Sequence, residues 1–265
     1  CMTASVKPSE TKENALKLPG ALFLLRDSWV IVWEQRMVIY GYTAWLLIPI
    51  VIFLFAQGVP SPYGDYLLIL ENLLELILSL WVTAAIVLYV AVVMSKKTHE
   101  DIDFAALGKR AGEKILILFI IQVFTVCLVL FGSILFIIPG IIAWVWTAFA
   151  MQEGILSQKG VWDTFKHSQE LTRGRFFAVL GRLVAAYIAF AAIVFVALAG
   201  YIAAGLHGAT SALIPTLLAW PSWLEVGFAL ITLPLTPVVI VYHLLLYFAA
   251  KKSYSLGSEK HESKV

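Results

Sequence analysis

The sequence predicts an all-α membrane protein with six transmembrane helices. Of its 265 residues, 61% are hydrophobic and only 14% are charged, whereas soluble domains average about 45–50% apolar and about 25% charged residues. Apolar runs of 19 or more residues recur along the chain, which is the length that crosses a bilayer as a helix. The net charge of +2 gives no reason to expect a nucleic-acid partner.

Between two polar tails, 1–19 and 253–265, we expect a membrane domain over 20–252. The predicted spans cover about 37–58, 67–95, 115–138, 139–156, 176–206 and 224–250. The second is most secure over 76–94, about 28 Å of helix at 1.5 Å per residue. The third and fourth are separated only by a Pro139-Gly140 turn, and Pro234 and Pro237 predict a bend in the sixth.

Three amphipathic helices are expected to lie at the cytoplasmic interface, over 20–36, 99–113 and 160–175. On the third, Trp162, Phe165 and Gln169 share one side at helical spacing. Each of these helices precedes a pair of spans. The order of elements therefore predicts a threefold repeat of helix, span and returning span.

The distribution of positive charge predicts the topology. All 19 Lys and Arg residues fall in the N-terminal segment up to Arg36, in 96–114, in 159–182 or after 250. The three intervening loops contain none. The positive-inside rule then places both termini in the cytoplasm, with the six spans in the inner (plasma) membrane.

The block from Ile138-Pro139-Gly140 through Gly160-Val-Trp-Asp-Thr-Phe165 to Leu171-Thr-Arg173-Gly174 resembles a bacterial family. It is similar to the membrane domain of glycerophosphoryl diester phosphodiesterases and the related YciC-like integral membrane proteins. The resemblance is specific over roughly 135–185. In those phosphodiesterases the catalytic domain is a separate C-terminal barrel, whereas this chain ends 15 residues after its last predicted span. We therefore expect no phosphodiesterase activity.

No Walker loop, Rossmann glycine pattern, His-Glu-x-x-His or Gly-x-Ser-x-Gly motif occurs in the sequence. We therefore expect a non-enzymatic, accessory or membrane-organising protein without cofactor or metal. Its expected partners are membrane lipids, and also another membrane protein or a second copy of this chain. The alternative is a small transporter or lipid-handling protein with a midplane cavity near Gln122 and Glu153.

Four polar residues in or near the spans are candidate functional residues: Glu71, Glu75, Gln122 and Glu153. Glu71 and Glu75 lie one helical turn apart. They are interpreted either as a cation or proton site or as residues at outer headgroup depth. Glu153 is interpreted as an ion-pair partner of Arg182 or Lys159, or as a substrate or proton site. Gln122 is interpreted as an interhelical hydrogen-bonding group rather than a ligand.

The basic residues near the predicted fifth span have a second interpretation. Arg173, Arg175 and Arg182 are candidate contacts for anionic lipid headgroups, worth about 1 kcal/mol each near the surface. Asp163, His167 and Glu170 also share a side of the third amphipathic helix. We expect this second group to form a solvated face with pairs at i,i+4 spacing.

Overall fold

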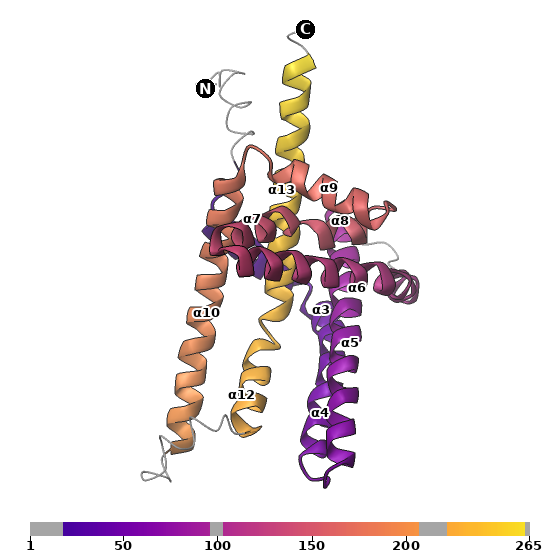
Figure 1. Cartoon of the computed structure of the whole chain (residues 1–265), viewed down its shortest axis with the longest axis vertical. Helices are drawn as coiled ribbons and strands as arrows, with labels where there is room; N and C mark the ends of the chain where they lie inside the picture. The colour runs from indigo at the N-terminus through magenta and orange to yellow at the C-terminus, as the bar shows by residue number, and fades with distance from the viewer. Residues whose placement is uncertain (1–17, 96–102, 207–221, 263–265) are drawn as a thin grey trace, which may run out of the picture. The chain divides into compact units, whose positions relative to one another are not determined.

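The computed structural model describes residues 18–95, 103–206 and 222–262, which form helices and, within those ranges, no strand (Figure 1). The elements are α2 (Ala21–Glu34), α3 (Arg36–Thr43), the 3₁₀ helix η1 (Ala44–Leu46), α4 (Leu47–Ala56), α5 (Tyr63–Ser95), α6 (Phe104–Leu135), α7 (Ile137–Thr147), α8 (Ala150–Leu156), α9 (Val161–Thr172), α10 (Phe176–Leu206), α12 (Ser222–Thr232) and α13 (Thr236–Glu262). The all-α class is thus confirmed.

Four of the described segments are long and apolar enough to cross a membrane: Arg36–Ala56, Tyr63–Ser95, Phe104–Leu135 and Phe176–Gly200. A fifth candidate is the pair Val226–Thr232 and Thr236–Ser255, which is bent by 43°. The break between them contains Pro234, as the sequence predicts, because proline supplies no amide donor to continue the helix. The described part of the chain therefore has four to five candidate spans, and six spans and the threefold repeat stay predictions.

The predicted fourth span, 139–156, does not form one helix. The chain breaks at Ala148-Phe149 into α7 and α8. With 11 residues, α7 is about 16 Å long, roughly half the hydrocarbon thickness. Of the predicted amphipathic helix 99–113, the part 99–102 lies outside the described residues, and 104–113 belong to α6, which runs without interruption from Phe104 to Leu135. The charged residues in its first turns show where the chain becomes polar, and Gly108 and Gly112 among them do not interrupt the helix.

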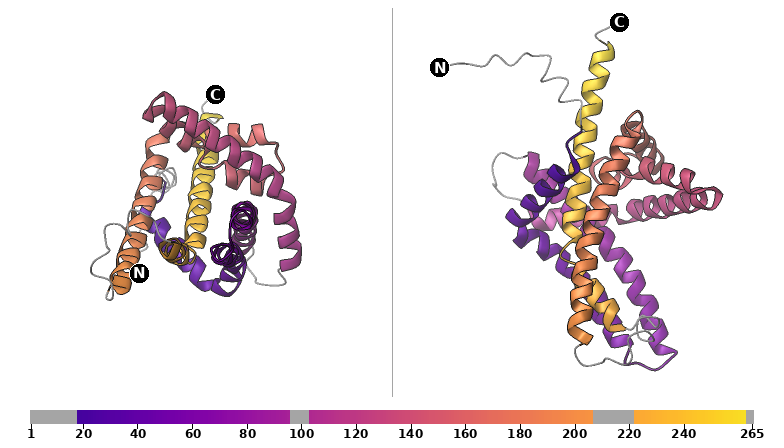
Figure 2. Two further views of the ribbon diagram at one scale, coloured as in Figure 1. Left: turned by 60° about the horizontal axis from the view of Figure 1, so that its bottom comes forward. Right: turned by 90° about the vertical axis from the view of Figure 1, so that its left-hand side faces the viewer.

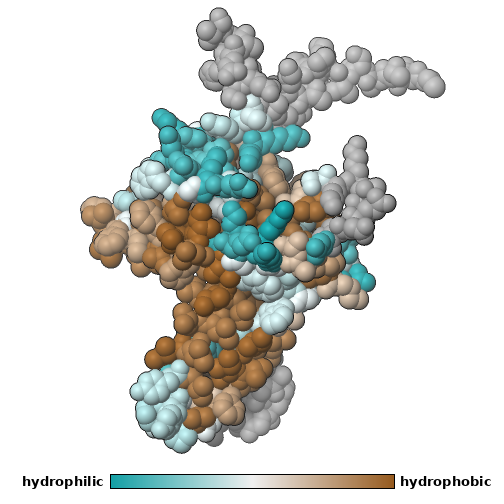
Figure 3. Space-filling view, turned by 90° about the vertical axis from the view of Figure 1, so that its right-hand side faces the viewer, coloured by the Kyte–Doolittle hydropathy of each residue, from teal (hydrophilic) through white to brown (hydrophobic). Residues whose placement is uncertain are grey.

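The chain forms two compact units, and the first comprises 29–115 and 184–241. In this unit α4 and α5 form an antiparallel hairpin (Figure 1). Aromatic hydroxyl and indole groups tie its elements together: Tyr89 donates to the Gln35 side chain at 2.6 Å, and Trp81 donates to the Gly108 carbonyl at 3.1 Å. Apolar side chains cover the visible surface of α4 and α5 (Figure 3).

The second unit comprises 1–28, 116–183 and 242–265, and its most prominent feature is the hairpin of α6 and α7 (Figure 2). Gly132 and Gly140 allow the two helices to touch, since a Cβ on Gly140 would lie 3.0 Å from the Cα of Ser133. Beyond this contact the hairpin ends in a tip of consecutive apolar residues.

Ser168 of α9 explains the break between α7 and α8. Its hydroxyl donates to the Trp146 carbonyl at 2.7 Å and accepts from the Phe149 amide at 3.2 Å. The side chain thereby satisfies two backbone groups at the break, which are costly to leave unpaired when buried. Ser168 itself is completely buried, so the same contact fixes α9 on α7 and α8.

Candidate functional site

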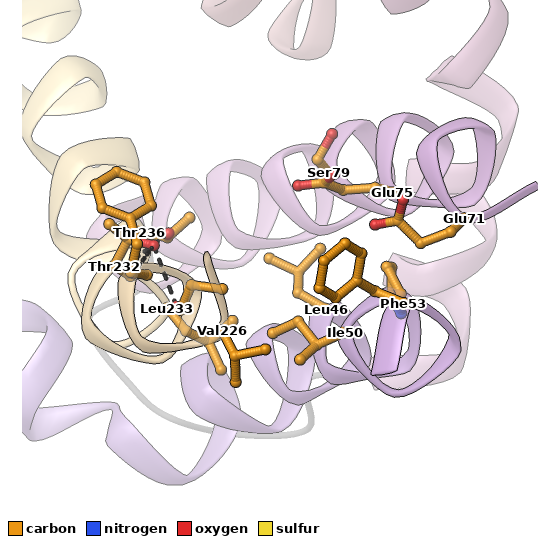
Figure 4. A pocket seen from close by; sticks show the side chains of 13 residues that line it. Leu46, Ile50, Phe53, Glu71, Glu75, Ser79, Val226, Thr232, Leu233 and Thr236 are labelled. Carbon is orange, nitrogen blue, oxygen red and sulfur yellow. Dashed lines mark hydrogen bonds between the residues drawn. The ribbon is translucent and has the colours of Figure 1, made fainter. Parts of the chain in front are cut away.

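A cavity of about 330 Å³ in the unit 29–115 and 184–241 contains the two predicted acidic candidates. Glu71, Glu75 and Ser79 of α5 line it on one side, and apolar residues of α4 face them (Figure 4). Thr232 and Thr236, at the break between α12 and α13, line another side. Two carboxylates and a broken helix therefore share one cavity.

The two carboxylates lie within α5 and not at its end. Glu71 and Glu75 are 8 and 12 residues after Tyr63, where the helix begins, or about 12 and 18 Å along its axis. Glu71 is 9% exposed and accepts a hydrogen bond from the Asn72 amide at 3.0 Å. Both residues therefore lie in the part of α5 that precedes its most apolar stretch, 76–94.

The broken helix presents its own polar groups near the cavity. The Thr232 hydroxyl donates to the Phe228 carbonyl at 2.9 Å, and the Thr236 hydroxyl donates to the Thr232 carbonyl at 3.1 Å. The Pro234 carbonyl accepts a hydrogen bond from Tyr40 at 3.2 Å. The two threonine hydroxyls thus add bonds to carbonyls near the break, where the Thr232 carbonyl also accepts from the Leu235 amide.

Glu153 is the centre of a second polar site, in the other unit. Its side chain is only 1% exposed. The Tyr247 hydroxyl donates to its Oε2 at 2.5 Å, and Lys159 Nζ lies 3.3 Å from its Oε1. Nitrogens of His167 and Lys251 lie 3.8 and 3.9 Å from Oε2. Burial alone would raise the pKa of Glu153, but the Tyr247 hydrogen bond and the three neighbouring cationic groups reverse this and lower it.

The contacts to Glu153 come from three parts of the fold, with Tyr247 and Lys251 both on α13. Lys159 lies in the connection between α8 and α9, His167 on α9, and Tyr247 on α13. Lys251 also donates to the Tyr247 hydroxyl at 2.9 Å. These contacts form a polar network that connects α13, α9 and the segment between α8 and α9, and in it each polar group has a hydrogen-bond or ion-pair partner.

The structure answers the ion-pair alternatives that the sequence left open. Lys159 is a partner of Glu153, and Arg182 is not. Arg182 instead donates to the carbonyls of Leu18, Pro19 and Ala178, at 2.5, 2.6 and 2.6 Å. On the predicted solvated face, Glu170 is 41% exposed, whereas the His167 ring is only 20% exposed and lies between Glu153 and Glu170.

Arg175 also has structural partners. Its guanidinium donates to the carbonyls of Ala250 and Ser253 on α13, at 3.2 and 2.7 Å, and burial lowers the pKa of Arg175. Arg175 and Arg182 therefore bind backbone carbonyls of distant segments. Among the three arginines predicted to contact lipid headgroups, only Arg173 makes no side-chain hydrogen bond to a backbone carbonyl among the described hydrogen bonds. Gln122 is half-buried on α6, and the described lining of the cavities includes neither Gln122 nor Glu153.

Sequence reasoning missed Tyr247 and the hydroxyls around Pro234. No local signal connects Tyr247 with Glu153, which is 94 residues away. Apolar helices long enough to cross a membrane identify the class, a helical membrane protein. No protein-family model matches the chain, and neither the curated proteins nor the solved structures contain a match.

Proposed function

We propose that this chain is a multi-pass protein of the inner membrane that organises bilayer lipid or a partner membrane protein, without catalysis of its own. The observation that carries this proposal is the exposed apolar tip of the α6–α7 hairpin. Five consecutive large side chains there are each between 68% and 79% exposed: Ile134, Leu135, Phe136, Ile137 and Ile138. Transfer of each out of water is worth about 1.5–3 kcal/mol, so we place the tip in hydrocarbon.

The polar groups at the base of the hairpin favour an anchor at the membrane surface. The α9 helix carries charged residues on one side and packs Phe165 toward Phe124 of α6, with ring centroids 5.4 Å apart. Ser168 fixes α9 to α7 and α8. With the tip in hydrocarbon and both termini in the cytoplasm, α9 lies at the cytoplasmic surface, where its charged side meets water.

The test uses purified protein in vesicles, with lipid order and vesicle diameter as readouts. We expect wild type to change both. A variant with Phe136, Ile137 and Ile138 replaced by Ser should lose most of the effect. The matched control places three Ser residues at Ile193, Phe195 and Val196 of α10, which are also exposed, and should keep it. No effect of wild type, or turnover of a substrate by the purified protein, would refute the proposal.

The cavity at Glu71 and Glu75 favours a second candidate, a small cation carrier. Discontinuous helices beside carboxylates are the usual construction of ion sites in secondary transporters. We therefore propose the transport site at Glu71 and Glu75 rather than at Gln122 and Glu153, because Lys159 and Lys251 already lie beside Glu153. Cation flux into vesicles should then fall strongly in Glu75→Gln and stay unchanged in Glu113→Gln, a control on the exposed face of α6. Equal flux in wild type and Glu75→Gln would exclude the carrier.

A further inference from the structure

A second cavity, of about 390 Å³, lies in the unit 1–28, 116–183 and 242–265. It is formed by α6, α7 and α9, and its volume falls in the range of about 300–1,000 Å³ that small-molecule pockets occupy. The residues of interest in its lining are Phe124, Trp146, Trp162, Phe165, Lys166 and Gln169. Four of the six are aromatic, one is cationic and one is an amide.

The aromatic walls come from all three helices. Phe124 of α6 lies edge-on to Trp162, with ring centroids 6.3 Å apart, and tilted against Phe165 at 5.4 Å. Trp146 of α7 contributes a further ring and is 42% exposed. These faces are open to an apolar chain, while the indole groups of tryptophan favour the boundary between hydrocarbon and water.

The polar groups of the cavity all come from α9. Lys166 and Gln169 follow Trp162 at four and seven residues, so the three share one side of the helix. The neighbouring acids Asp163 and Glu170 are absent from the described lining, and Glu170 lies 3.5 Å from His167. The cavity therefore offers a cation and an amide to an anionic group.

The cavity is held open by contacts that do not involve its lining side chains. Ser168 ties α9 to the backbone of Trp146 and Phe149. Gly154 of α8 lets Ile121 of α6 approach closely, since a Cβ there would lie 2.5 Å from the Ile121 side chain. Three helices are thus positioned before any ligand binds.

From this arrangement we infer that the cavity binds one anionic phospholipid of the surrounding membrane. The acyl chain and glycerol lie against Phe124, Trp146 and Trp162, and Lys166 and Gln169 bind the phosphate. A Lys near an anionic surface is worth about 1 kcal/mol, which corresponds to a preference of about fivefold over a zwitterionic lipid. This inference rests on the proposed function, and it specifies anionic phospholipid as the lipid class that the protein binds.

The experiment uses the full chain in nanodiscs with equal amounts of phosphatidylglycerol and phosphatidylcholine. Lipids retained by the protein are counted by native mass spectrometry. We expect about fivefold enrichment of phosphatidylglycerol in wild type, loss of the enrichment in Lys166→Gln, and no change in Lys252→Gln, an exposed lysine of α13. Trp162→Ala should lower retention of both lipids and preserve their ratio.

Three results would overturn the inference. They are no enrichment in wild type, equal loss in Lys166→Gln and Lys252→Gln, and displacement of the lipid by excess soluble glycerol phosphate. The last would mean that the site takes a free phosphate. The two proposals can fail separately. If wild type had no effect on vesicles but still enriched phosphatidylglycerol in a Lys166-dependent way, the organising function would be refuted and the lipid site would be supported.

Discussion

Replacing Glu153 with glutamine removes the charge on which four side chains converge. The Tyr247 hydroxyl, at 2.5 Å, makes the shortest contact. A hydrogen bond to a charged group contributes about 1.5–3 kcal/mol. Lys159 and Lys251 are 45% and 52% exposed, so each can turn to water, and each adds only about 0–1 kcal/mol. We therefore expect Glu153→Gln to lower the free energy of unfolding by about 1.5–3 kcal/mol.

The assay is thermal unfolding of the purified protein in nanodiscs, followed by intrinsic fluorescence. Glu170→Gln is the matched control, because Glu170 is 41% exposed and its loss should cost no more than about 0.5 kcal/mol. Tyr247→Phe should cost about as much as Glu153→Gln, and the two should couple by about 1 kcal/mol or more in a double-mutant cycle. Equal unfolding temperatures for Glu153→Gln and Glu170→Gln, or strict additivity in the cycle, would refute this reasoning.

Three further predictions concern pH and backbone packing. The pKa of Glu153 is lowered in the folded protein. The stabilisation that this carboxylate provides is therefore complete above the ordinary glutamate pKa of about 4.3 and is lost as pH falls below that value. The unfolding temperature should show this loss in wild type and not in Glu153→Gln. Arg175→Lys should lower stability by about 1–3 kcal/mol because an ammonium cannot bind both α13 carbonyls as a fork does, whereas Arg173→Lys should stay within about 0.5 kcal/mol. Gly140→Ala should cost about 1–3 kcal/mol by overpacking against α6, whereas Gly112→Ala, where a Cβ meets no atom within 4 Å, should gain up to about 1 kcal/mol; equal melting of the two glycine variants would contradict the packing.

Much of the helix content follows from local pattern. The apolar runs that begin near Arg36 and Phe176 appear as candidate spans, and Pro234 marks the observed break. The limits of α6 do not follow, because Lys109, Arg110 and Glu113 change the polarity of the chain without disfavouring a helix. Charge predicts where a helix meets water, whereas only a backbone constraint predicts where it ends.

The break between α7 and α8 shows what local pattern cannot supply. Ala148 and Phe149 carry no helix-breaking signal. The break is stabilised by Ser168, whose hydroxyl pairs with one carbonyl and one amide about 20 residues earlier in the chain. Arg182 is a similar case, because the carbonyls it binds are those of Leu18 and Pro19. Such tertiary partners decide both the helix limits and the roles of the candidate residues.

The two glutamate sites differ in what balances their charge, and this separates their roles. Two lysines, the His167 ring and a tyrosine hydroxyl surround Glu153, so a further cation would gain little there. Around Glu71 and Glu75, the described lining of the cavity contains hydroxyl and apolar side chains and no Lys, Arg or His. Ionised carboxylates away from water need a compensating charge. Cation flux in Glu75→Gln is therefore the measurement that decides between an organising protein and a carrier.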